Sequence, residues 1–127
     1  MAEVVLTLPW PPSVNRYYRH VGPRVLISRE GRQYRRRVET QLRGRVPTLR
    51  GPLALHVDCY PPDRRRRDLD NLCKSLQDTL QHAGLYEDDS QIKDLRLRMR
   101  EPAPPDGRVA LRATPCGEGA DDEDGNP

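Results

Sequence analysis

Three aspartates and one lysine have the types and the spacing needed to handle a phosphate ester. Asp68 and Asp70 are two residues apart, so in extended backbone both carboxylates leave the same side of the chain. Lys74 follows Asp70 by four residues, which is one helical turn along the same face. A strand that begins near Ile92 is expected to bring Asp89 back beside the first pair. The sequence therefore predicts a catalytic site made of Asp68, Asp70, Lys74 and Asp89, with the three aspartates as metal ligands.

Such a cluster of carboxylates suits Mg²⁺, which takes oxygen ligands from a few acidic side chains, water and substrate phosphates. Without a cation the crowded carboxylates would repel one another, and a divalent ion removes that cost. A bound ion activates a water and stabilises a phosphodiester under attack. Lys74 and the N-terminus of its helix would add positive charge beside the same phosphate. We expect Mg²⁺ as the cofactor, with Mn²⁺ as a substitute.

Each of these features taken alone also has a simpler structural explanation. Asp70 can serve as a helix cap, with Asp68 as a second capping acid. Residues 88–90 alone are typical of an ordinary turn. Asp78 lies four residues beyond Lys74 and could simply pair with it on the helix surface. The combination of all of them in one short stretch favours the metal site over these separate roles.

Basic residues cluster directly before the acids and in an early proline-rich loop. Four consecutive arginines at 64–67 repel one another unless something neutralises them, and a DNA phosphate beside a metal site would do so. The loop at 11–19 combines asparagine, arginine and tyrosine, which can bind or stack on nucleotides but could equally pack the loop. The residues predicted to bind DNA are Asn15, Arg16, Arg19, Arg64, Arg65, Arg66 and Arg67.

The distribution of charge along the chain agrees with a polyanionic partner. The formal net charge is +3, from 22 basic and 19 acidic residues. Five of the acids lie in the segment 114–127, which has no Lys or Arg, so the rest of the chain is more basic than the total suggests. A basic body is typical of a protein that binds nucleic acid, although solubility alone is the alternative.

The hydrophobic pattern predicts a small single domain of mixed α/β or α+β class. Ser28 is a suitable N-cap for a strongly basic helix. Strict alternation at 53–60 is typical of a half-buried strand, and Gly84 is well placed to end the second main helix. Strands are expected at residues 4–8, 25–27, 53–60, 95–100 and 108–113, and the two main helices at 28–42 and from about residue 70 to 83. The domain is therefore predicted to span 1–113, followed by an acidic, disordered tail at 114–127.

Several other classes of protein do not fit the sequence. Its three cysteines form no CxxC motif or Cys/His cluster, so neither a disulfide framework nor a zinc site is expected. No signal peptide is evident, and no apolar run approaches the length of a membrane span. We expect a cytoplasmic protein with no membrane partner.

At this point the motifs resemble a known family, the RusA crossover (Holliday) junction endodeoxyribonucleases. The resemblance rests on the stretch Arg67–Lys74, on Asp78 and Gly84, and on Glu87–Ile92. The early segment Pro11–Asn15 is similar to the N-terminal signature of that family. Together these motifs cover roughly residues 4–113, and the acidic tail has no counterpart in the pattern.

The resemblance implies both a fold and an activity. Enzymes of this family are homodimers of a mixed α/β fold that resolve four-way DNA junctions by paired symmetric nicks with Mg²⁺, in DNA recombination and repair. They are common in phages and prophages. The catalytic aspartates of the family fall on Asp68, Asp70 and Asp89, and its catalytic lysine falls on Lys74. The alternatives are a branched-DNA binding module without catalysis and a nuclease for other branched DNA.

Overall fold

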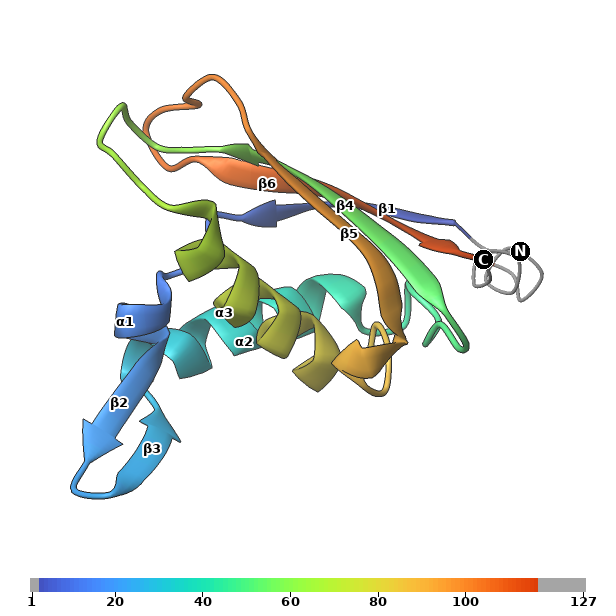
Figure 1. Ribbon diagram of the computed structural model, residues 1–127, viewed down its shortest axis with the longest axis horizontal. Helices are drawn as coiled ribbons and strands as arrows, with labels where there is room; N and C mark the ends of the chain where they lie inside the picture. The colour runs from blue at the N-terminus through green and yellow to red at the C-terminus, as the bar shows by residue number, and fades with distance from the viewer. Residues whose placement is uncertain (1–2, 117–127) are drawn as a thin grey trace, which may run out of the picture.

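The computed structural model describes residues 3–116, which form a four-stranded sheet with helices packed on one of its faces and a separate two-stranded hairpin (Figure 1). In chain order the elements are β1 (Val4–Pro9), α1 (Val14–Tyr17), β2 (Tyr18–Val21), β3 (Arg24–Ile27), α2 (Arg29–Leu42), β4 (Leu53–Tyr60), α3 (Leu69–His82), the 3₁₀ turn η1 (Asp89–Gln91), β5 (Ile92–Met99) and β6 (Arg108–Pro115). The predicted class, a small mixed α/β domain with two main helices, is confirmed. Within the described residues, no helix is both long and apolar enough to cross a bilayer.

The four-stranded sheet is mixed and has the order β1-β6-β4-β5. Only the pair of β4 with the edge strand β5 is parallel, and the remaining neighbours are antiparallel. Because parallel strands must be joined by a crossover, α3 runs back along the length of the sheet between the end of β4 and the start of β5 (Figure 1). The two ends of α3 therefore lie at opposite ends of the β4–β5 pair.

The core lies between the sheet and the two long helices. The alternation predicted for β4 is confirmed, since Leu53, Leu55, Val57 and Cys59 are all buried and the residues between them are half-buried. Four of the buried side chains in α2 and α3 that face this strand are Val38, Leu42, Leu76 and Leu80. Burying apolar side chains on one face of each element is the main stabilising contribution to such a two-layer fold.

Strand β5 is the least covered part of the sheet. Leu95, Leu97 and Met99 pair in register with the buried residues of β4, so they lie on the helix-covered face. Leu95 and Met99 nevertheless remain 42% and 38% exposed. Among the described strands β5 has β4 as its sole neighbour, which leaves one edge of its backbone unpaired. The helical layer thus stops short of this edge of the sheet.

The segment predicted as a loop at 11–19 is more ordered than the sequence indicated. It holds the short helix α1, and Tyr18 begins a hairpin in which β2 pairs with the predicted strand at β3. Tyr17 is completely buried and anchors the segment against α2 and α3. Gly31 makes this packing possible, because a Cβ there would lie 2.6 Å from the Tyr17 carbonyl oxygen. Ser28 caps α2 as predicted, accepting a hydrogen bond from the Gly31 N–H at 2.9 Å.

The last strand extends beyond the predicted end of the domain. β6 continues through Thr114 to Pro115, which pair with Ala54 and Leu53 of β4. The structured part therefore reaches at least two residues past the predicted boundary at 113. The acids of the predicted tail, and the disorder expected for it, lie outside the described residues.

Candidate active site

Two of the predicted catalytic acids lie at the N-terminus of α3. Asp68 is the N-cap residue of the helix, yet its side chain makes no capping hydrogen bond. Asp70 lies in the first turn, and both residues are exposed. Neither carboxylate accepts a hydrogen bond or pairs with a cation elsewhere in residues 3–116. The capping interpretation is therefore wrong for Asp68, and both carboxylates face solvent at the positive end of the helix dipole.

Lys74 lies one turn further along α3 and also lacks a carboxylate partner among the described residues. Its ammonium nitrogen lies 5.8 Å from the ring centroid of Tyr18, which is a cation–π contact. The pairing with Asp78 that the sequence suggested does not form, because that carboxylate is engaged on the other side by Arg35. Lys74 therefore keeps its charge unneutralised on the exposed face that begins at Asp70.

The third predicted acid, Asp89, lies at the opposite end of α3. Its backbone N–H donates to the Gln81 side-chain oxygen at 2.9 Å, and Gln81 is in the last turn of the helix. Eleven residues separate Gln81 from Asp70, which corresponds to about 16 Å along a helix axis. The strand that begins at Ile92 thus leaves Asp89 far from Asp68 and Asp70 in the same chain, unlike the expectation. Across residues 3–116, no three His, Cys, Asp or Glu side chains gather closely enough to hold a metal ion.

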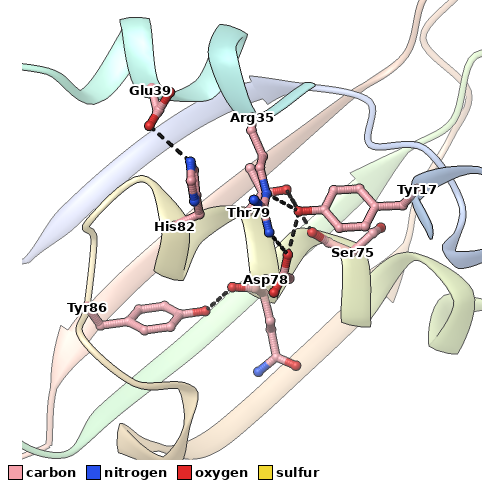
Figure 2. A network of polar contacts seen from close by, with 9 residues as sticks. Tyr17, Arg35, Glu39, Ser75, Asp78, Thr79, His82 and Tyr86 are labelled. Atoms are coloured by element: carbon pink, nitrogen blue, oxygen red, sulfur yellow. Dashed lines mark hydrogen bonds and ion pairs between the residues drawn. The ribbon is translucent and has the colours of Figure 1, made fainter. Parts of the chain in front are cut away.

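A network of polar side chains fixes α1 against α2 and α3 (Figure 2). The Tyr17 hydroxyl donates to Asp78 at 2.5 Å and accepts from the Arg35 Nε at 2.8 Å and from Thr79 at 3.2 Å. Arg35 also forms an ion pair with Asp78 at 2.7 Å. Burial alone would raise the pKa of Asp78, but the hydrogen bonds from Tyr17 and Arg35 outweigh it and lower that pKa. The network holds Tyr18, the next residue, against Lys74.

Replacing Tyr17 with Phe tests this network. Burial, followed by the hydrogen bond to Asp78, raises the pKa of Tyr17 to about 12. The lost hydroxyl leaves Arg35 and Asp78 short of a partner, and we expect a loss of about 1–2 kcal/mol in unfolding free energy at pH 7. Since an unfolded tyrosine titrates near pH 10, the contribution of Tyr17 is complete below pH 10 and is lost as the pH rises to about 12.

The measurement is urea unfolding of both proteins at pH 7 and in steps from pH 9 to 12. The stability difference between wild type and Tyr17→Phe should shrink across the alkaline range, because Phe does not titrate. Tyr60→Phe is the matched control, since the Tyr60 hydroxyl makes no hydrogen bond to another described residue. A difference that stays constant up to pH 12 contradicts the assignment.

Beside Asp68 the surface is hollowed to a volume of about 620 Å³. The hollow lies between the segment at 10–16, α2 and the loop that joins β4 to α3. Its acidic lining consists of Asp68 and Glu30, whereas five arginines face it. These arginines are Arg16, Arg37, Arg65, Arg66 and Arg67. A concave surface with this balance of charge attracts an anionic chain such as a nucleic-acid backbone.

The four consecutive arginines are not equivalent. Arg67 is half-buried, pairs with Asp63 at 2.8 Å, and lies 5.7 Å from the ring centroid of Trp10. Hydrogen bonds from Arg67, and then from the Arg65 backbone, lower the pKa of Asp63. Arg67 thus holds the loop in shape, while Arg64 to Arg66 are exposed.

Of the other predicted DNA contacts, Asn15 and Arg16 line the hollow, and Arg19 lies on the β2–β3 hairpin. Sequence reasoning missed Trp10 as a lining residue and Tyr18 as the neighbour of Lys74. The basic character of the helix at 28–42 was a signal for Arg37, but nothing in the spacing indicated Tyr18.

Most of the chain is similar in sequence to known proteins. Residues 9–112 match the family described as Endodeoxyribonuclease RusA. The chain is 46% identical over 114 residues to the crossover junction endodeoxyribonuclease rusA of Enterobacteria phage 82, covering 88% of this chain and 94% of that protein. The identity is 44% over the same length and coverage for the Escherichia coli K12 protein with the same description.

Proposed function

The chain belongs to the RusA family of endodeoxyribonucleases, and from that premise we propose that it resolves four-way DNA junctions by nicking them in recombination and repair. One observation carries the proposal. Two exposed carboxylates at the start of α3, Asp68 and Asp70, have no partner among the described residues, and Asp68 lines a hollow that five arginines also line. A phosphodiester chain drawn along those arginines would meet the acids at the start of α3.

For the metal we propose Mg²⁺, with Mn²⁺ as a substitute, held by Asp68, Asp70 and Asp89. Two hard oxygen donors are available at the N-terminus of α3, which is what such a cation takes from a protein. The fit is incomplete within one chain, because Asp89 lies at the far end of the helix. A bound divalent ion supplies an activated water and stabilises charge on the phosphate. Lys74, which has no carboxylate partner in the described chain, is proposed to stabilise the developing charge on the same phosphate.

We further propose that the working unit is a homodimer in which two chains complete each metal site. If two copies of α3 lie antiparallel about a two-fold axis, the end that carries Asp89 in one copy meets the end that carries Asp68 and Asp70 in the other. The unpaired edge of β5, with Leu95 and Met99 partly exposed, follows directly after η1. Covering that apolar surface with a second copy would remove it from water.

The DNA contacts are proposed in three groups. Asn15, Arg16, Arg65 and Arg66 would follow the phosphate chain through the hollow, and Arg64 and Arg19 would extend that path on either side. Arg67 would act mainly by holding the loop that presents its neighbours. Because junctions form where the chromosome is replicated and repaired, we propose that the protein works in the cytoplasm of a bacterial cell.

A nicking assay on matched substrates tests the proposed function. A four-way junction, a flap and a linear duplex of the same sequence are labelled on each strand and incubated with Mg²⁺, Mn²⁺ or EDTA. We expect paired nicks at symmetric positions in the junction with either cation and none in EDTA. Binding without nicking in any divalent ion would mean a binding module. Equal cleavage of the flap would mean a nuclease for branched DNA in general.

A further inference from the structure

The β2–β3 hairpin projects from the rest of the molecule (Figure 1). The residues around its turn include two exposed valines. Val21 is 41% exposed and Val25 is 58% exposed, and both are among the large hydrophobic residues that the described chain leaves in solvent. Gly22 makes the tight turn between the strands with a φ of +61°, a conformation that suits the first position of a two-residue hairpin turn. Bulky apolar side chains at a projecting turn are unusual unless a partner covers them.

The two valines lie on opposite faces of the ribbon. Val25 pairs with His20, and Val21 pairs with Arg24. Residues directly opposite in an antiparallel pair share a face, and consecutive residues alternate, so the valines face in opposite directions. Each face of the tip therefore presents one apolar side chain, so the tip could contact a flat apolar surface on either side.

The charge around this tip selects the kind of partner. No Asp or Glu occurs between Glu3 and Glu30, while Arg19, His20 and Arg24 are exposed on the hairpin itself. A purely apolar protein partner gives no reason for the absence of acidic residues from this segment. DNA does, because its stacked base pairs have flat apolar faces and are surrounded by negatively charged phosphates, which acidic residues would repel.

The base of the hairpin is held rigidly. The Ser28 N–H donates to the Tyr17 carbonyl at 2.9 Å, and the Arg32 guanidinium donates to the Ile27 carbonyl at 2.9 Å. Tyr18, the first residue of β2, contacts Lys74 of α3. Val21 lies three residues beyond Tyr18 in the strand, which is about 10 Å, or the height of about three stacked base pairs. The hairpin therefore holds its tip at a fixed distance from Lys74, which we propose to act on the phosphate.

From these observations we infer that the hairpin is a wedge that enters the centre of a four-way junction, with Val21 and Val25 against the base pairs beside the exchange point. The inference rests on the proposed function, since it assigns a part of the same substrate to this hairpin. Inserting apolar side chains between bases requires unstacking, which costs several kcal/mol in a continuous duplex and less where stacking is already interrupted. The wedge thereby favours a junction over linear DNA.

The test replaces both valines by threonine, which keeps the shape and the strand propensity but removes apolar character. Val5→Thr is the matched control, because Val5 is 64% exposed on β1. A junction with 2-aminopurine beside the exchange point reports unstacking by its fluorescence, and a second junction carries the analogue inside one arm. Affinity for junction and for linear duplex is measured with each protein in EDTA, where no nicking is expected.

We expect wild type and Val5→Thr to raise the emission at the exchange point and leave the arm unchanged. Val21→Thr/Val25→Thr should not raise it, and should weaken junction binding at least about fivefold with little effect on duplex. Unchanged emission with wild type, or an equal loss of both affinities in the variant, overturns the wedge. Wild type that unstacks the centre but never nicks the junction in Mg²⁺ supports the wedge and overturns the proposed function.

Discussion

Asp70→Asn is expected to abolish nicking of a four-way junction, by at least about 100-fold, while the fold and junction binding persist. Asn has the same size, and no hydrogen bond within residues 3–116 is lost with the carboxylate. What is lost is a negatively charged oxygen ligand at the start of α3. Removing one negative charge near the DNA phosphates should leave binding unchanged or tighten it slightly.

The measurements are single-turnover nicking in Mg²⁺, junction affinity in EDTA, and urea unfolding. Asp106→Asn is the matched control, because Asp106 is an exposed acid in the turn before β6 whose side chain makes no hydrogen bond or ion pair with another described residue. Control activity should equal that of wild type. Nicking at the wild-type rate by Asp70→Asn would exclude Asp70 as a metal ligand. If Asp70→Asn and Asp106→Asn lost the same nicking activity, the cause would be the change in net charge and not the loss of a ligand.

Mixing two inactive variants is expected to restore nicking activity. Asp70→Asn and Asp89→Asn should each be inactive alone. In a mixed dimer whose sites take Asp70 from one chain and Asp89 from the other, one site receives both substitutions and the second site receives neither. Each mixed dimer then has one intact site, although neither variant has one by itself.

After subunit exchange about half of the dimers are mixed, so nicking should recover to about a quarter of the wild-type rate. The products should be single nicks, because the opposite strand has no functional site. Two preparations of Asp70→Asn mixed with each other give the background. If both acids of a site came from the same chain, each mixed dimer would hold two damaged sites and the mixture would stay inactive.

Local patterns in the sequence predicted the main elements correctly. Alternation predicted β4 and its buried face, and the cap at Ser28 predicted the start of α2. Both signals work because they depend on residues that are neighbours in the chain and on the repeat of the backbone itself. The paired carboxylates at the start of α3 were predictable for the same reason.

Contacts between distant segments were beyond such patterns. The sequence suggested that Asp78 pairs with Lys74, its neighbour on the helix. In the structure Asp78 pairs instead with Arg35, which is 43 positions away. Arg67 was grouped with three other arginines, but contacts with Trp10 and Asp63 give it a structural role. A side chain from a distant segment contacts each residue, namely Arg35 for Asp78 and Trp10 for Arg67.

The sequence alone thus predicted a basic domain of mixed α/β class. It also identified the aspartates and the lysine whose chemistry suits a metal-dependent nuclease. Only the tertiary structure decided how those acids are distributed. Because β4 and β5 are parallel, α3 must span the sheet between them, so an acid just before β5 lies at the far end of the helix from an acid just after β4. The direction of one strand therefore separates, within a single chain, the acids that the sequence predicted to cluster.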